Sequence, residues 1–116
     1  YKMDENQKLN PQEISNEMVC SIANLAALGV DGIDKMFMRM SDEILDMIYP
    51  SAVSKGVKVV RQEDGYHIDV HVITELGIDI PQIARKTQIK VKESVEIMTG
   101  NQVAQVNVHV EGSGKY

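Results

Sequence analysis

The sequence is poor in aromatic residues and in cysteine. Phe, Tyr and Trp make up 4% of its 116 residues, with no Trp at all, so the core must be built from Val, Ile, Leu, Ala and Met. The one cysteine, Cys20, has no second thiol to pair with inside the chain, which favours a reducing compartment. No stretch approaches the roughly 18 apolar residues that a membrane-spanning helix needs. The sequence therefore excludes an internal disulfide framework and predicts no helical membrane span.

Cationic residues are outnumbered as well. Twelve Lys and Arg stand against 17 Asp and Glu, which gives a net charge of −5. Nucleic-acid-binding domains usually carry a basic patch, and an anionic membrane repels a negative protein on average. The cations are scattered singly, apart from Arg85-Lys86 and the pair Lys90 and Lys92. The charge disfavours nucleic acid and lipid as partners, and a hydrophobic content of 43% at this length predicts one soluble globular domain.

Hydrophobic periodicity divides the domain into helices and strands. The predicted helices are 16–28 and about 80–98, and the predicted strands are 56–62, 66–76 and 103–110. Gly29 is expected to end the first helix as a residue that tolerates positive φ, and a turn with a short strand is expected at 29–33. A short helix at 41–48 is expected to end at Pro50.

One face of the predicted sheet is apolar and needs a cover, which the two amphipathic helices supply. We therefore predict an α+β fold of two layers, in which a small, mainly antiparallel β-sheet is covered on one face by two α-helices. The domain is expected to run over 11–112, after a disordered tail at 1–10 and before a short tail at 113–116. A variable insert is expected at about 36–55.

Strand alternation and helical spacing assign individual side chains to faces. The inner face of the sheet is predicted to hold Tyr66, Ile68, Val70, Val72, Thr74, Leu76, Ala104, Val106, Val108 and Val110. The outer face is predicted to hold His67, Asp69, His71, Ile73, Glu75, Gln105, Asn107 and His109. The apolar stripe of the second helix is predicted to hold Ile80, Ile83, Ala84, Thr87, Val91, Val95 and Met98. Burial of six inner aliphatic residues is worth roughly 9–18 kcal/mol gross, so this layer decides the fold.

Several motifs of the second half occur together in one known family. They are the strand Ile68-Asp69-Val70-His71-Val72, the pair Leu76-Gly77, the helix start Ile80-Pro81-Gln82-Ile83-Ala84, the helix end Met98-Thr99-Gly100 and the strand Val106-Asn107-Val108-His109-Val110. Over about residues 12–112 the chain resembles the alkaline shock protein family of Gram-positive bacteria, a family of cell-envelope and general stress proteins. The last two motifs are the most specific. Leu76 departs from the aromatic residue that the family commonly has there.

The resemblance implies a cytoplasmic stress-response protein with no established enzymatic activity and no cofactor. It further implies self-assembly into a homo-oligomer, or a place near the membrane through a small membrane-anchored partner. We therefore expect a non-enzymatic scaffold with no catalytic residue and no bound metal. Nucleic acid is not expected as a partner, and neither is direct membrane insertion.

Three histidines are expected on the outer face of the sheet, where imidazoles and a carboxylate could bind a divalent metal. His67 and His71 are four residues apart on one strand, about 13 Å by the rise per residue, so they cannot share an ion. His71 and His109 meet only if their strands are neighbours in register. A solvated polar face is the simpler interpretation, and a self-association surface that includes His71 and His109 is the alternative.

A methionine-rich segment precedes the expected short helix. Met side chains repack easily and suit adaptable partner surfaces, whereas filling a gap in the core is the competing interpretation. We predict partner-binding residues at Phe37, Met38 and Met40, in addition to the two histidines His71 and His109. Phe37 is the only Phe in the chain and is the expected anchor of such a surface.

Two further features were weighed against their simpler interpretations. Cys20 is flanked by Val19 and Ile22, which predicts a buried, inert thiol. The stretch Gly29-Val30-Asp31-Gly32 matches the GxxG loop of RNA-binding KH domains, but that loop joins two helices among basic residues. A tight turn is therefore expected here, and a nucleic-acid-binding module with KH-like element order is the alternative function. No phosphate-binding loop, dinucleotide fingerprint or zinc spacing occurs in the sequence.

Overall fold

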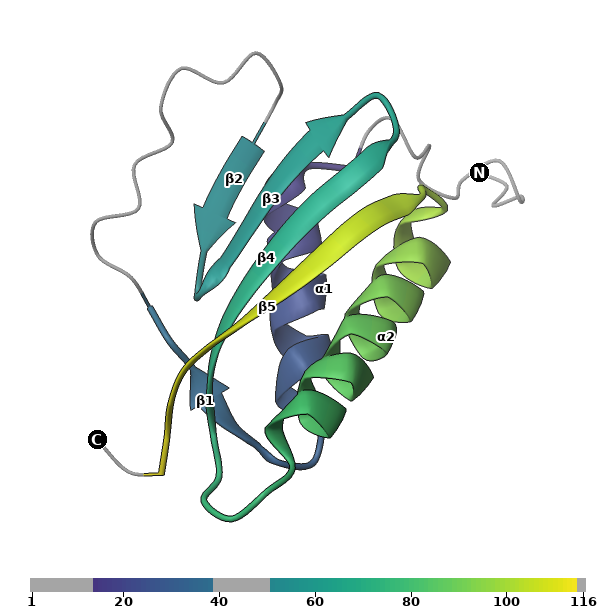
Figure 1. Cartoon of the computed structure of the whole chain (residues 1–116). Helices are drawn as coiled ribbons and strands as arrows, with labels where there is room; N and C mark the ends of the chain where they lie inside the picture. Colours follow the sequence, from purple (N-terminus) through teal and green to yellow (C-terminus); the bar gives the residue numbers. More distant parts are fainter. Residues whose placement is uncertain (1–13, 39–50, 115–116) are drawn as a thin grey trace, which may run out of the picture.

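The computed structural model describes residues 14–38 and 51–114, which form two helices and five strands (Figure 1). In chain order these are α1 (Asn16–Leu28), β1 (Ile33–Met36), β2 (Ser51–Ser54), β3 (Val57–Gln62), β4 (Gly65–Thr74), α2 (Ile80–Thr99) and β5 (Val103–Ser113). The predicted tail at 1–10, the predicted helix at 41–48 and Met40 lie outside the described residues. Both predicted long helices and all three predicted strands are present.

The five strands form one sheet around β4. β3 pairs antiparallel with the first half of β4, and β1 pairs antiparallel with its last residues. β5 runs parallel to β4 along its whole length, so β1 and β3 must share the other edge of β4. β2 extends the sheet beyond β3 in antiparallel pairing. The sheet is therefore mainly antiparallel, with one parallel pair whose connection is α2.

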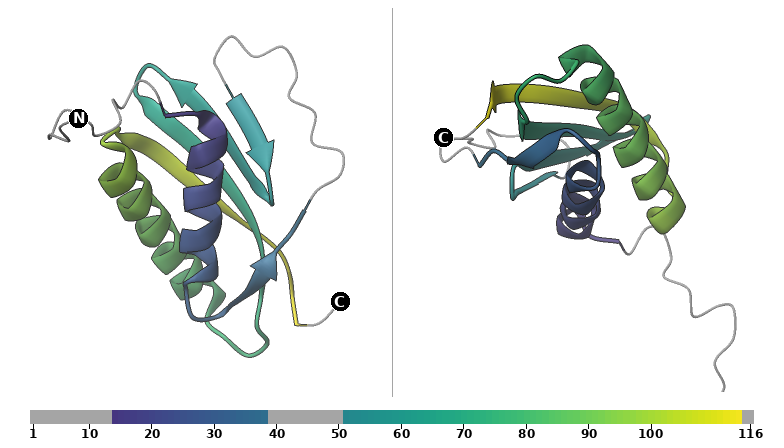
Figure 2. Two further views of the ribbon diagram at one scale, coloured as in Figure 1. Left: turned by 180° about the vertical axis from the view of Figure 1, so that it is seen from behind. Right: turned by 90° about the horizontal axis from the view of Figure 1, so that it is seen from below.

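Both helices lie on the same face of the sheet, side by side and in opposite directions (Figure 2). Each begins at the kind of residue that the sequence indicates. The Ser15 hydroxyl accepts a hydrogen bond from Met18 N at 3.1 Å, and the Asp79 carboxylate accepts one from Gln82 N at 3.3 Å. The aliphatic residues between the layers are almost fully buried, among them Val19, Val59, Ile68, Val70, Val91, Val95 and Val103. The predicted two-layer α+β fold is confirmed.

The end of α1 differs from the prediction. Gly29 has a φ of −79° and donates its N–H to the carbonyls of Leu25 and Ala26, so the helix ends without a left-handed residue. The positive φ occurs at Gly32, at 106°. A Cβ atom at Gly32 would lie 2.8 Å from the Cδ1 atom of Ile83 in α2. Close packing of this turn against α2 therefore explains why a glycine stands here.

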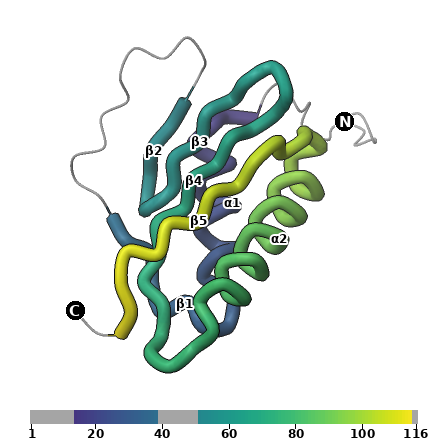
Figure 3. Tube along the Cα trace, viewed as in Figure 1, coloured from purple at the N-terminus to yellow at the C-terminus, as the bar shows by residue number. Residues whose placement is uncertain are grey.

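Three sheet residues lie on a different side from the predicted one. Leu76 is 74% exposed, because β4 ends at Thr74 and the chain has left the sheet. Ala104 is exposed because the register shifts beside it, and Val103 is buried in its place. Ile73 is buried although it was predicted to face outward. Both neighbours of β4 carry a register shift next to Ile73, and the strands bend there (Figure 3).

The buried stripe of α2 also differs at its two ends. Its buried residues are Ile83, Thr87, Val91, Val95 and Thr99, each four positions after the last. A step of four residues overshoots one helical turn by about 40°, so this line winds around the helix. Ile80 and Met98 were predicted to lie on the stripe but are exposed, because the line has turned away from them at either end.

Candidate functional site

The outer face of the sheet, opposite the helices, carries an ordered polar array. The parallel register aligns His67 with Gln105, Asp69 with Asn107 and His71 with His109. This is the register that an encounter between His71 and His109 requires. Within the described residues both helices lie on the other side of the sheet. His109 is exposed there, but His71, which was predicted to be open to solvent, is buried at 7% exposure.

Two imidazoles stack at the centre of this array. The rings of His71 and His109 have centroids 4.5 Å apart and planes inclined by 13°. His71 Nδ1 lies 2.7 Å from Glu111 Oε1, and His109 Nε2 lies 2.9 Å from Asp69 Oδ1. Asn107 Nδ2 donates to the same Asp69 oxygen at 3.1 Å. Each ring is therefore held in place by its own carboxylate, and we call these five residues the histidine array.

Glu111 was missed by the sequence analysis, which ended the strand at 110. It is the extra residue at the register shift between Val72 and Ile73. Alternation continued past His109 places residue 111 on the same outer face, so a strand predicted three residues longer would have included it. The neighbouring Gly112 was an available signal, because glycine within a strand often marks a bulge. His67 stands apart from the stacked pair, with Nε2 2.7 Å from Asp64 Oδ1.

The predicted partner-binding residues come together beside the histidine array. Phe37 N donates to the backbone carbonyl of His71 at 2.8 Å, which holds the end of β1 against β4. Met38 is 65% exposed and shares a hollow of about 170 Å³ with His71, Lys55 and Gly56. Phe37 and Met38, which follow β1, thus lie near His71 of β4 and His109 of β5. Their role as a contact surface stays a prediction.

The hollow does not assemble a nucleophile and a base. Ser54 also lines it, and His71 with Glu111 forms the base half of a triad-like arrangement. A serine nucleophile needs its hydroxyl within about 3.2 Å of the base. Among the described residues Ser54 makes no side-chain hydrogen bond to His71.

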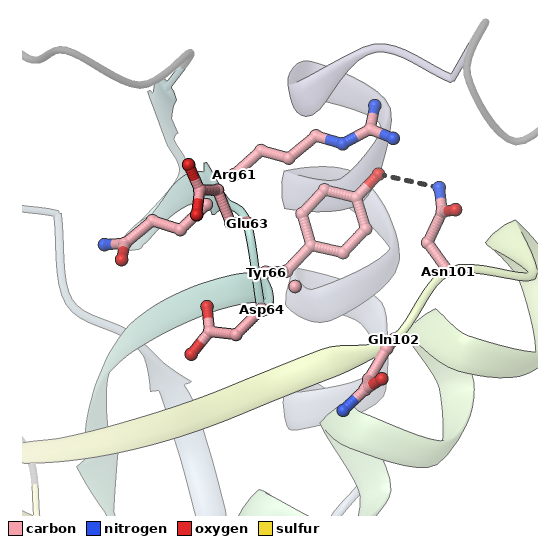
Figure 4. Close-up of a pocket in the computed structure, with 8 residues that line it drawn as sticks. Arg61, Glu63, Asp64, Tyr66, Asn101 and Gln102 are labelled. Atoms are coloured by element: carbon pink, nitrogen blue, oxygen red, sulfur yellow. Dashed lines mark hydrogen bonds between the residues drawn. The ribbon is translucent and has the colours of Figure 1, made fainter.

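A second hollow lies at the opposite end of the sheet, between the β3–β4 turn and the start of β5 (Figure 4). The hydroxyl oxygen of Tyr66 accepts a hydrogen bond from Asn101 Nδ2 at 3.3 Å. The Arg61 guanidinium carbon lies 5.7 Å from the centre of the Tyr66 ring. Its volume of about 200 Å³ is below the roughly 300–1,000 Å³ of most ligand sites. These contacts tie the two loops together, because Tyr66 N also donates to the carbonyl of Gln102.

Metal binding and thiol chemistry have little support in this geometry. In residues 14–38 and 51–114, no group of three or more His, Cys, Asp or Glu side chains is arranged to hold an ion. Cys20 is 1% exposed, and its Sγ lies 3.7 Å from the carbonyl oxygens of Ala52 and Val57. Burial, and secondarily the charge of Glu17, raises the pKa of the Cys20 thiol to about 11. The prediction of a buried thiol is confirmed, and its lack of reactivity stays a prediction.

The GxxG stretch connects α1 to β1, and so joins a helix to a strand as predicted. Its middle residue Asp31 is exposed, and Gly32 packs against α2 as described above. Neither helix that the structure describes combines the length and the hydropathy needed to cross a bilayer.

Comparison with known proteins places the chain in a family. Residues 4–113 match the model of the alkaline shock protein 23 family, described by a cell envelope-related function. The uncharacterized protein YqhY of Bacillus subtilis is 32% identical over 112 residues, which cover 96% of this chain and 83% of YqhY. The uncharacterized protein YloU of the same organism is 32% identical over 102 residues, which cover 86% of this chain and 85% of YloU.

A more distant relative is the uncharacterized protein Spy1535 of Streptococcus pyogenes serotype M6. It is 28% identical over 100 residues, which cover 85% of this chain and 75% of Spy1535. No solved structure matches the chain significantly. The family match spans nearly the whole sequence and confirms the resemblance carried by the strand and helix motifs. The chain therefore belongs to the alkaline shock protein 23 family, whose function is related to the cell envelope.

Proposed function

We propose that this protein is a non-enzymatic scaffold of cell-envelope homeostasis that binds itself or a membrane-anchored partner through the outer face of its sheet. The observation that carries the proposal is the ordered histidine array on a sheet face that the two helices leave uncovered. The cell envelope-related description of the family supports the cellular role. A cytoplasmic place close to the membrane, reached through the partner, and a part in the stress response belong to the same proposal.

Side chains that are already ordered are suited to binding. Fixing a flexible side chain at an interface costs roughly 0.5–1.5 kcal/mol, which weakens association. In the histidine array, stacking and carboxylate hydrogen bonds fix His71 and His109 before any partner arrives. A partner that covers the exposed His109 ring, with His71 buried beneath the same surface, would therefore lose little of its binding free energy to ordering it.

Apolar side chains stand next to the array. Met38 is largely exposed and Phe37 is half-buried, and both follow directly after β1. Protein interfaces commonly have an apolar or aromatic anchor surrounded by polar groups, and Met and aromatic residues are enriched at their cores. Phe37 and Met38 would supply the anchor, and the imidazoles with their carboxylates would supply the polar surround.

The proposal is tested by changing two equally exposed apolar residues on opposite faces. Met38 is 65% exposed beside the histidine array, and Leu25 is 71% exposed on the outer side of α1. Met38→Asp should weaken self-association or partner binding about tenfold or more, because it places a charge in the anchor. Leu25→Asp, the matched control, should leave binding within about twofold.

The measurements are sedimentation velocity of the purified full chain and retention on immobilised protein of solubilised membrane proteins. His109→Ala, which removes one ring of the stack without adding charge, should weaken association less than Met38→Asp does. A wild-type chain that stays monomeric and retains no membrane protein would overturn the proposal. Sensitivity to Leu25→Asp and not to Met38→Asp would assign the contact to the helical face instead.

A further inference from the structure

The exposed side of α2 differs in charge from the rest of the chain. The whole sequence has a net charge of −5, but the helix carries four cations against two carboxylates, Glu93 and Glu96. Apolar residues are exposed on the same helix, with Ile89 at 51%. An acidic protein therefore presents one basic and partly apolar helical surface, which the function proposed above does not use.

Most of the charged neighbours of Ile89 are cations. Residues three and four positions apart are neighbours on a helix surface, so Ile89 adjoins three cations, Arg85, Lys86 and Lys92, and one carboxylate, Glu93. Lys92 is partly engaged, with Nζ 3.1 Å from the carbonyl oxygen of Val103 and 3.8 Å from Glu96 Oε2. In the described part of the chain Arg85 and Lys86 form no hydrogen bond or ion pair. Two cationic groups beside an exposed isoleucine are thus available to a ligand.

A groove runs along this side of α2. It lies between α2 and the outer edge of β5, and it has a volume of about 250 Å³. Its lining consists of Gln88, Ile89, Lys92, Ala104, Gln105 and Val106. Apolar side chains from both elements alternate with polar ones, so the groove can accept an apolar side chain while acidic neighbours reach Arg85 and Lys86.

The backbone edge of β5 is already occupied along this groove. Gln88 Nε2 donates to the carbonyl of Val106 at 3.2 Å, and the Glu96 carboxylate accepts from Val103 N at 2.9 Å. With the Lys92 contact, three side chains of α2 satisfy backbone groups that an added strand would need. A ligand must therefore bind here through side chains and not by extending the sheet.

We propose that this groove receives an acidic, apolar segment of a second copy of the chain, residues 42–48. That segment reads Asp-Glu-Ile-Leu-Asp-Met-Ile and combines three carboxylates with four large apolar side chains. The described residues on either side of it are Met38, two positions after β1, and Ser51, the first residue of β2. Both strands lie on the other side of β4 from β5 (Figure 1). The segment of one copy thus meets the groove of another in a head-to-tail contact.

A protein segment suits the groove better than a lipid surface does. The net charge of −5 opposes an approach to anionic lipid, whereas an acidic segment needs only the local cations. This contact between copies is separate from the outer face of the sheet, so the inference goes beyond the proposed function.

The test exchanges charges between the two surfaces of the full chain. Arg85→Glu with Lys86→Glu reverses the charge of the α2 surface beside the groove, and Asp42→Lys with Glu43→Lys reverses two charges of the segment. Each double variant alone should self-associate about tenfold or more weakly than wild type in sedimentation velocity. An equimolar mixture of the two should regain association, because a reversed α2 surface then meets a reversed segment. Lys35→Glu, at an exposed lysine of β1, is the matched control for Lys86→Glu and should change nothing.

Further measurements separate the outcomes. A labelled peptide of residues 40–50 should bind the wild-type chain saturably and lose affinity as salt is added, and the peptide with Asp42→Asn, Glu43→Gln and Asp46→Asn should not bind. Failure of the mixture to regain association would overturn the head-to-tail contact, even where Met38→Asp still abolishes self-association and the proposed function stands. Binding of phosphatidylglycerol vesicles that depends on Arg85 and Lys86, without any binding of the peptide, would assign the groove face to lipid and overturn the proposal.

Discussion

Raising the pH should destabilise this fold through its single thiol. Cys20 lies in α1 against β2 and β3, 1% exposed, with its Sγ 3.7 Å from the backbone carbonyl oxygens of Ala52 and Val57. Burial is the larger cause and the charge of Glu17 the smaller one in raising the pKa of Cys20 from 9.0 to about 11. The unfolded chain has no such environment, so its thiol titrates near the ordinary value.

The free energy of unfolding falls with rising pH because the folded state keeps the Cys20 proton to a higher pH than the unfolded state does. Below about pH 8 the thiol is protonated in both states and contributes nothing to the pH dependence. Between about pH 9 and 11 the unfolded chain loses the proton while the folded chain keeps it, which favours unfolding by about 1.4 kcal/mol per pH unit. The free energy of unfolding should therefore fall by up to roughly 2–3 kcal/mol over this window and change no further through this group above it.

Urea unfolding of the wild-type chain and Cys20→Ala, at about pH 8 and about pH 11, measures this contribution. Lysine and tyrosine titrations are common to both proteins, so the difference between their pH dependences isolates the thiol. Cys20→Ala should lose less stability than wild type on going to the higher pH. Parallel losses in the two proteins would show that the Cys20 pKa is not raised, and would refute the reasoning from burial.

Two comparisons test the packing of the fold. Val91→Ala, at a fully buried position of α2, should lower the free energy of unfolding by about 2–3 kcal/mol, whereas Ile89→Ala on the exposed side should lower it by less than about 1 kcal/mol. Chemical denaturation measures both values. Equal losses of stability in the two variants would contradict the assigned faces of the helix. Gly77→Ala should lower the free energy of unfolding by roughly 1–2 kcal/mol, because Gly77 has a positive φ. Gly65→Ala should lower it clearly more, because Gly65 also has a positive φ and a Cβ atom there would lie 2.5 Å from the backbone oxygen of Gln102. Thermal melts that rank the two glycine variants in the opposite order would contradict the close approach at the β3–β4 turn.

Local sequence signals located most elements because each signal acts over a few residues. Ser15 and Asp79 cap the helices that follow them, and a spacing of three to four apolar residues marks the side of each helix that is buried. The alternation from Tyr66 to Thr74 identified β4 and most of its inner face. The ends of elements were less well determined, and Leu76 and Ile80 were assigned to the core for that reason.

The candidate site depended on pairing between strands far apart in the sequence. That His71 and His109 lie on the same face followed from alternation, but their stacking required β5 to pair with β4 in one particular parallel register. The participation of Glu111 required β5 to continue to Ser113 and to pair with β4, which brings the carboxylate to His71.

What the sequence by itself determined was the set of helices and strands, the aliphatic core and the family, because these rest on periodicity and short motifs. Only the tertiary structure decided which polar groups meet. It aligned the imidazoles with Asp69 and Glu111, set Met38 beside His71, and closed the edge of β5 with side chains of α2. The physical reason is that a side chain's face follows from local geometry, whereas its partner across the sheet follows from register and topology.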